Sequence, residues 1–346
     1  MRFHSQIGMS AYHDLLRLMR DDVVSDLIGT PVAVTVKGRV FWYDKYRIGA
    51  KMGQKYIGPD SEDLRARLAQ AKELKADAEA RRRARTRLVR LLRAEGYTST
   101  DQRTGSLLNA FARTGVFRLG GTLVGTVAFR HYEGELGVQL GVDHLAQTGD
   151  IDIGSFERLS FAVDDVVETP LVEVFKSLAF EPVPSLDNAR TWRWSQGGGE
   201  TLVEFLMPAH RDEGVRDLPA LGVSAIALRH LDYLLHDPIP AVALYRSGVL
   251  VQIPRPERFA IHKLIVADRR AGGPDAQKSA KDRAQAAYLI DALLELRPDE
   301  LSDAYLAARA RGPKWVARIE ASLARMPRTA DSLARLSGAI DGEGAG

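Results

Sequence analysis

Two aspartates separated by a single isoleucine, Asp150 and Asp152, lie in the segment TGDIDIG (residues 148–154). The apolar residues beside them predict a β-strand. Successive side chains of a strand point to opposite faces, so these two carboxylates share one face. Ionised carboxylates that close repel each other unless a cation joins them, and oxygen ligands at this spacing suit Mg²⁺. We therefore predict a Mg²⁺ (or Mn²⁺) site at Asp150 and Asp152.

A third acidic residue, Glu204, lies in another strand-like segment, TLVEFLMP (residues 201–208). The alternation of this strand places Glu204 in one row with Leu202 and Leu206. A carboxylate buried in an apolar row is costly unless it is paired or bound to a metal. If this strand runs beside the first one, the acids together would hold two metal ions. The alternative is that Glu204 is a surface residue of an edge strand.

A glycine pair in RLGGTLVGTVAF predicts an anion-binding turn. We expect a short apolar strand, VFRLGG, to end at Gly120 and Gly121, and a helix, TLVGTVAFRHYEGEL, to begin at Thr122. Glycines let backbone N–H groups approach a phosphate, and a helix N-terminus favours anions. The Thr122 hydroxyl can donate to a phosphate oxygen. A triphosphate bridged to metal ions and attacked by an acceptor oxygen is the arrangement of phosphoryl or nucleotidyl transfer.

The elements that must position these residues predict an α+β protein. Around the acids we expect a helix ending at Gly115, a further strand at 158–163, a helix over 164–180 and a hairpin over 190–208. A second hairpin (241–254) and then helices only are expected toward the C-terminus. The predicted divisions are 1–97 (helix, β-hairpin module and long basic helix), 98–210 (the core with the acids), 211–335 (hairpin plus helices) and a disordered tail at 336–346.

The N-terminal division has a basic character. A helix over 9–29 precedes a strand and hairpin pattern over 30–59, which interleaves cations with aromatic rings. Residues 60–96 are predicted to form one long helix, whose polar middle suits an arm or a coiled-coil spacer. The segment ARRRARTRLVRLLR (80–93) holds many arginines and no acid.

Helical spacing places Arg83, Arg87 and Arg90 in one stripe of this long helix. Such a stripe can bind the phosphates of a nucleic acid, or it can simply be a solvated helix face.

The composition excludes several classes of protein. The chain has 346 residues, a formal net charge of +3 and no Cys, which excludes disulfides, cysteine nucleophiles and thiolate metal sites. The lack of Cys fits a reducing, cytoplasmic setting. No apolar run approaches the roughly 20 residues that cross a bilayer, so no membrane partner is expected. Walker A, G-x-G-x-x-G and G-x-S-x-G motifs are also lacking.

The order RLGGTLVGTVAF, TGDIDIG, VEFL resembles the nucleotidyltransferase superfamily that includes polymerase β. More narrowly, the chain is similar to the bacterial nucleotidyltransferase fold protein family. It is similar more distantly to the nucleotidyltransferase toxins of abortive-infection toxin–antitoxin systems, whose Lys-bearing helix and "KD" helix match PRPERFAIHKLIVADRR and KSAKDRAQAAYLID. The resemblance implies a nucleotidyltransferase-fold mixed sheet with helices, an NTP substrate and, for the toxins, a cognate antitoxin.

The resemblance also implies roles for individual residues. Gly120, Gly121 and Thr122 become the phosphate-contacting turn, and Asp150, Asp152 and Glu204 become the catalytic, metal-binding acids. Lys263, Lys281 and Asp282 become candidates for contacts with the nucleotide, although Lys263 on an amphipathic helix can equally be a surface lysine.

The sequence departs from the superfamily pattern at three places. The gap between Gly121 and Asp150 is longer than usual, so residues 131–147 are an insertion or an extra element. The third acid is Glu instead of the commoner Asp. Gln285 stands where the toxins usually carry another Asp, which weakens the analogy with the toxins.

Two functions of different classes follow. The first is a Mg²⁺-dependent transferase that moves a nucleoside monophosphate from an NTP to an acceptor hydroxyl. RNA, such as tRNA, is the favoured acceptor, and a protein hydroxyl is the runner-up. The second is a non-catalytic nucleic-acid-binding protein that keeps the fold and binds through residues 31–95. Binding of Mg²⁺ or Mn²⁺ together with NTP distinguishes the two.

Overall fold

A computed structural model of the chain describes most of its length. The described residues are 1–25, 27, 29–48, 51–140, 150–155, 167, 170–184, 190–197, 201–209, 211–273 and 276–343. The strand expected at 158–163 and part of the predicted insertion, residues 141–147, lie outside these ranges.

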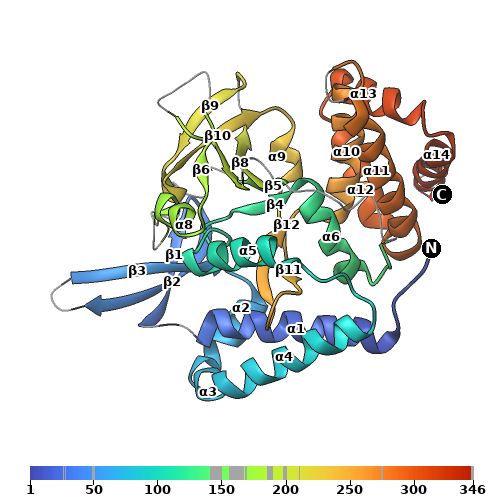
Figure 1. The fold of residues 1–346 in the computed structure, drawn as a ribbon. Coiled ribbons are helices and arrows are strands. Elements are labelled where there is room, and N and C mark those ends of the chain that lie inside the picture. Colours follow the sequence, from blue (N-terminus) through green and yellow to red (C-terminus); the bar gives the residue numbers. More distant parts are fainter. Residues whose placement is uncertain are drawn as a thin grey trace.

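A mixed β-sheet forms the centre of the molecule (Figure 1). Its main strand order is β4-β5-β8-β10-β9; β7 pairs with β8, and β6 pairs with β7. The pairs β5–β8 and β8–β10 are parallel, whereas β4, β7 and β9 run antiparallel to their neighbours. Their bounds are β4 Thr122–Val124, β5 Asp150–Gly154, β6 Glu181–Pro182, β7 Arg193–Gln196, β8 Thr201–Pro208, β9 Gly214–Leu218 and β10 Val223–Leu228. The sheet and the surrounding helices confirm the predicted α+β, nucleotidyltransferase-type fold class.

One face of this sheet packs into the core because its strands alternate. Ile151 and Ile153 of β5 and Val203 and Phe205 of β8 are buried. They lie against helices α5 (Gln102–Thr114) and α8 (Leu171–Ser177), whose aromatic rings meet the ring of Phe205 at centroid distances of 6.3 and 6.1 Å. With the apolar side chains committed to this face, the intervening acids must lie on the opposite one.

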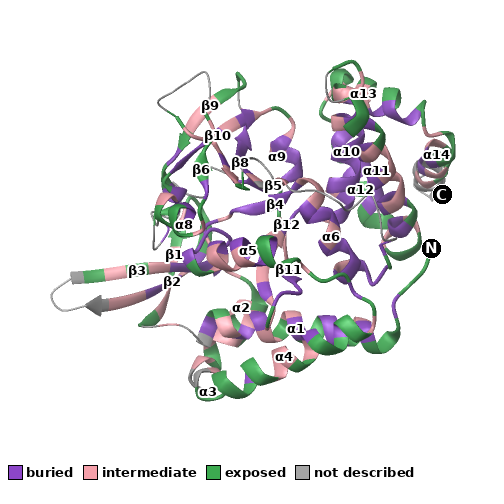
Figure 2. Cartoon of the chain, in the orientation of Figure 1, coloured by how far each residue is buried: buried purple, intermediate pink, exposed green. Residues whose placement is uncertain are grey.

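Helices cover the opposite face and form the C-terminal region, as predicted. Helix α6 follows β4 directly, and α10 packs against α9, α11, α12 and α13. Figure 2 shows α10 as a largely buried helix. The helix bounds are α6 Gly125–Leu136, α9 Leu231–Leu234, α10 Pro256–Arg270, α11 Ala276–Leu296, α12 Pro298–Arg309, α13 Pro313–Leu323 and α14 Pro327–Glu343, with a short 3₁₀ turn at Pro219–Leu221.

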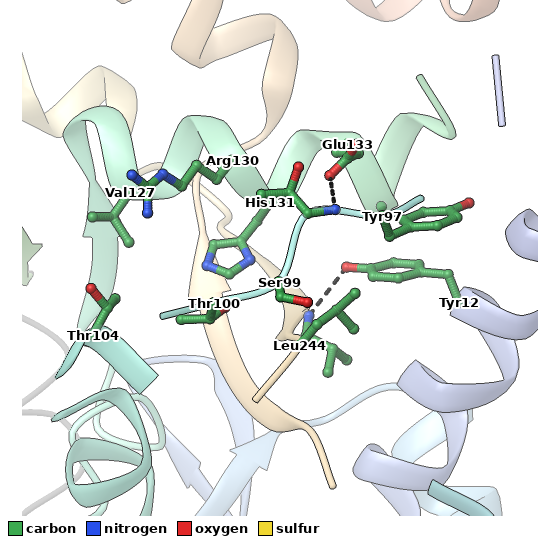
Figure 3. A pocket seen from close by; sticks show the side chains of 13 residues that line it. Tyr12, Tyr97, Ser99, Thr100, Thr104, Val127, Arg130, His131, Glu133 and Leu244 are labelled. Atoms are coloured by element: carbon green, nitrogen blue, oxygen red, sulfur yellow. Dashed lines mark hydrogen bonds between the residues drawn. The ribbon is translucent and has the colours of Figure 1, made fainter. Parts of the chain in front are cut away.

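The N-terminal helices pack on a hairpin from far along the chain. Helix α1 (Gln6–Ser25) and helix α4 (Ala78–Ala94) share an apolar cluster with strands β11 (Ile239–Ala243) and β12 (Val249–Ile253). Within it, the backbone N–H of Val242 donates to the hydroxyl of Tyr12 over 3.1 Å. Figure 3 shows this contact beside Tyr97 and the buried His131 of α6. The cluster attaches the N-terminal helices to the rest of the protein.

The prediction of one long helix over 60–96 that forms an arm is wrong. The segment divides into α2 (Glu62–Ala69), α3 (Ala71–Ala76) and α4, and α4 lies along α1. The side chains of Arg81 and Arg85 reach back to Asp22 of α1. The polar composition that suggested an arm therefore includes arginines that pair across a helix interface.

The predicted β module is confirmed as a separate sheet in the order β1-β2-β3 (Thr30–Val36, Arg39–Ile48, Lys51–Pro59). The outer part of the β2–β3 hairpin extends away from the body in Figure 1. Its base is anchored by the buried rings of Phe41, Tyr43 and Tyr56, and Arg118 donates to the backbone carbonyl of Tyr56.

Two further expectations differ from the structure. The predicted disordered tail is helical up to Glu343, because α14 continues through it. The predicted strand VFRLGG is a series of turns, and the strand of this region starts after it, at Thr122. Among the described helices, none combines the length and apolar character that crossing a bilayer requires.

Candidate active site

The three predicted acids lie together on one face of the central sheet. Strands β5 and β8 pair in parallel, with Asp152 beside Glu204 and Asp150 beside Leu202. The adjacency of these strands, on which the two-metal prediction depended, is therefore present. The side chain of Glu204 also accepts an ion pair from Arg193 of β7, with 2.7 Å between Nη2 and Oε1.

The electrostatics of Asp152 reflect this crowding. Burial, followed by the negative charges of Glu204 and Asp150, raises the pKa of Asp152 to about 7. The cations Lys263 and Arg270 act in the opposite direction without cancelling the increase. A carboxylate in this state gains stability from any cation that binds next to it.

A cavity of about 400 Å³ opens beside Asp152. The sheet lines one side of it with Val124, Asp152 and Leu206, and α10 lines another side with Lys263, Arg269 and Arg270. Clefts of this size hold small molecules and cofactors in many proteins. An acidic edge facing a basic wall suits a ligand that carries both metal ions and phosphates.

The basic wall is held in place from behind. The carboxylate of Asp282, on α11, accepts from Lys263 Nζ and from Arg270 Nη1, each over 2.6 Å. Asp282 is buried and does not line the cavity, so the structure places it behind the predicted nucleotide contacts. A direct contact between Asp282 and a nucleotide is therefore not supported, because both of its oxygens are already engaged.

Lys281 lies within electrostatic range of the acids. Burial and the neighbouring Lys263 lower the pKa of Lys281, whereas Asp150 and Asp282 act to raise it. Its position at the acidic edge is consistent with the predicted role in nucleotide binding, and that role stays a prediction.

The predicted phosphate turn at Gly120–Thr122 is not at a helix N-terminus. The N–H groups of Gly120 and Gly121 donate to the carbonyls of Phe117 and Val116, and the Thr122 hydroxyl donates back to Gly120. Thr122 is almost fully buried and starts strand β4, and the helix begins at Gly125. The helix was predicted too early because TLV is apolar enough for either element, and its pairing with β5 makes it a strand.

The residue at the start of the helix is Gly125, which sequence reasoning missed. Gly125 lines the cavity with a φ of +65°, and a Cβ built there would lie 2.3 Å from Oδ2 of Asp152. The first N–H groups of α6 receive no side-chain cap. The signal was present as the second Gly-Thr of the motif, in LVGTVAF, where Gly125 follows the glycine pair that led to the prediction by four positions.

The donor set fits a divalent metal that arrives with its substrate. No three His, Asp or Glu side chains form a ready metal cage in the described ranges. Magnesium, however, is commonly held by one or two carboxylates together with substrate phosphates. Asp150 and Asp152 provide two such oxygen ligands, and their mutual repulsion favours a cation between them.

The arginine stripe lies on the outer side of α4. Arg83, Arg87 and Arg90 are exposed, and within the described residues Arg83 pairs with Glu79 of the same helix. The predicted positions on one open face are therefore present, and binding of a nucleic acid there stays a prediction.

Comparison with known proteins identifies the family of the chain. A family model described as "Nucleotidyltransferase" matches residues 102–310, more than half of the chain, and this span contains the acidic strands, the cavity and α10. No curated protein and no solved structure matches the chain. The chain therefore belongs to the nucleotidyltransferase family.

Proposed function

We propose that this protein transfers a nucleoside monophosphate from an NTP to an acceptor hydroxyl in a Mg²⁺-dependent reaction. The observation that carries the proposal is one cavity in which Asp152, beside Glu204, faces Lys263 and Arg270. The acceptor oxygen forms a bond to the α-phosphorus, the bond from that phosphorus to the bridging oxygen breaks, and pyrophosphate and the hydroxyl proton leave.

The acidic residues would bind metal, and the basic residues would bind phosphate. Asp150 and Asp152 would hold Mg²⁺ or Mn²⁺, which neutralises phosphate charge and orients the reacting oxygens. Lys263 and Arg270 bind the phosphates, and Asp282 keeps both cations aimed at them. Gly125 allows the chain to pass close to Asp152 and presents the first N–H groups of α6 to a phosphate. Glu204 completes the acidic edge.

RNA is the acceptor that the surface favours. Exposed Arg83, Arg87 and Arg90 offer a row of cations to a phosphate backbone. If the acceptor is a tRNA, transfer would interfere with translation, and a cognate antitoxin would be the expected partner.

Removing one acid tests the proposal. Asp150→Asn and Asp152→Asn should each reduce transfer of α-labelled NMP to RNA on the order of 10²–10³-fold, the range for loss of one group that stabilises transition-state charge. Without metal, Asp152→Asn should unfold at the same or a higher temperature, because it removes a repulsion. Thin-layer separation of the labelled products and thermal unfolding provide the two measurements.

A matched control is Asp217→Asn, which changes an exposed aspartate of β9 in the same sheet. This control should keep full activity. Near-normal Mg²⁺-dependent turnover by either acid variant would refute the assignment. RNA binding by the wild type without transfer from any NTP would favour the non-catalytic alternative.

A further inference from the structure

Helix α10 presents two neighbouring stripes of side chains to the cavity. At about 100° per residue, Lys263 and Arg270 lie on one stripe, and His262 and Arg269 lie on the next, with Val266 between them. All of these residues line the cavity. The first stripe faces Asp152 and Asp282. The second therefore faces a different part of the same space.

That second part is bounded by leucines. The segment from Leu228, the last residue of β10, to Leu234, the last residue of α9, contributes three of them, and β8 contributes another; the four are Leu206, Leu228, Leu231 and Leu234. Together with Val266 they give the region next to His262 an apolar lining, and Arg229, His230 and Arg269 line the cavity beside it. A flat ring with polar edges can lie against the leucines while its edge atoms stay within reach of polar side chains.

His262 is a polar residue that lines the cavity next to these leucines. Its side chain is only 9% exposed, and no hydrogen bond to its ring is formed by any residue that the structure describes. Burial, followed by the positive charge of Lys263 and contributions from His230, Arg269 and Arg270, lowers the pKa of His262 to about 3. The imidazole is therefore neutral and offers one N–H donor and one nitrogen acceptor.

We propose that the nucleobase of the NTP occupies the region between Val266 and the Leu228–Leu234 segment, where His262 hydrogen-bonds to its edge and selects among the bases. This inference rests on the proposed function, because the phosphates must lie on the Lys263 and Arg270 stripe. The neutral imidazole can hydrogen-bond to the edge of a base, and it carries no charge that would attract the triphosphate. The wrong base would leave His262 or a base atom unpaired in an apolar site, which is the costly outcome.

Binding measurements on the whole protein test this. Calorimetry in Mg²⁺ would compare ATP, GTP, CTP, UTP and inorganic tripolyphosphate. The wild type should prefer one base by about tenfold or more in Kd, the size expected from one unpaired buried polar group. His262→Leu should bring the four Kd values to within about threefold of each other, and His262→Asn should keep part of the preference. Tripolyphosphate should bind both variants as it binds the wild type.

The matched control is His236→Asn, since His236 is exposed and lies just beyond α9. It should keep the base preference. Equal affinities of the wild type for all four NTPs, or an unchanged preference in both His262 variants, would overturn the inference and leave the proposed function intact. Failure of the wild type to bind any NTP would overturn both. Thermal unfolding shows that each variant is folded before it is assayed.

Discussion

Gly125 is the residue whose backbone most directly limits the candidate site. Its φ of +65° is the left-handed conformation that favours glycine, and its α-carbon faces Asp152 so closely that a Cβ would collide with Oδ2. The turn and the acid therefore depend on each other. A larger residue would have to displace the carboxylate that we expect to hold the metal.

Gly125→Ala should accordingly impair function more than stability. We expect a loss of at least about tenfold in transfer activity, with a stability cost of about 1–2 kcal/mol from the left-handed backbone. Gly222→Ala is the matched control: its φ is +64°, but nothing lies within 4 Å of the added Cβ. It should show the same stability cost with normal activity. Equal activities of the two variants would show that the collision at Asp152 has no role.

At the scale of elements, the arginines of helix α4 form two sets, one paired with α1 and one exposed to solvent. Arg81 and Arg85 pair inward with Asp22, and Arg83, Arg87 and Arg90 face solvent. A helix with this distribution can be stripped of its outer charges without losing its packing. The outer row is therefore open to a direct test of RNA binding.

Replacing Arg83, Arg87 and Arg90 together with Gln should weaken RNA binding and flatten its salt dependence. Each lost phosphate contact should reduce the log–log slope by about 0.7–0.9. Titrations of labelled tRNA at several salt concentrations measure this, with NTP affinity expected to stay unchanged. The control variant carries Gln in place of Arg325, Arg328 and Arg335, which are exposed in the C-terminal region. It removes the same amount of charge from another part of the surface. Equal slopes for the wild type and the first variant would identify α4 as a solvated face.

Sequence reasoning located the elements with a strong local pattern. TLVEFLMP is β8 to the residue, the helix ending at Gly115 is α5, and PERFAIHKLIVADRR is α10. It failed where a distant partner decides the structure. TLV becomes a strand because β5 pairs with it, and the glycines before it are used within a turn. Strands β9 and β10 were missed; β9 forms by pairing with β10, and β10 also pairs with β8.

For the candidate site too, sequence reasoning found the residues that a local pattern determines and missed those that depend on a distant element. Asp150, Asp152 and Glu204 were found because alternation along a strand fixes a face. His262, Arg269 and Arg270 were not found, since nothing local distinguishes a cavity-lining position of α10 from its other faces. Only the sheet opposite the helix makes that distinction.

On the scale of the whole molecule, burial keeps several histidines uncharged in different parts of the fold. Burial lowers the pKa of His131 to about 4, as it does for His230 and, to about 3, for His262. In the unfolded chain a histidine has a pKa of about 6.5. The unfolded state therefore binds more protons than the folded one as the pH falls below that value, and the folded state loses stability.

The free energy of unfolding should thus decrease between about pH 6.5 and pH 4, by up to about 1.4 kcal/mol per pH unit for each such histidine. Asp152 acts in the opposite sense, because its pKa is raised. The difference between the wild type and His131→Gln, from urea unfolding at pH 7.5, 6 and 5, isolates one residue. The wild type should lose more stability with acid than this variant. The control, His13→Gln at an exposed site of α1, should follow the wild type. Parallel curves for the wild type and His131→Gln would contradict the prediction.

The contact between Tyr12 and Val242 also has a consequence for how the protein is made. These residues are 230 positions apart, so on a ribosome adding roughly 5–20 residues per second, α1 waits roughly 10–50 s for its partner hairpin. Helix α4 emerges much earlier and packs on the same face of α1 through Val89 and Leu92. The two helices can shield each other's leucines while the sheet and the cavity are still being synthesised. The N-terminal pair can thus cover part of the apolar face of α1 until the β11–β12 hairpin has been synthesised.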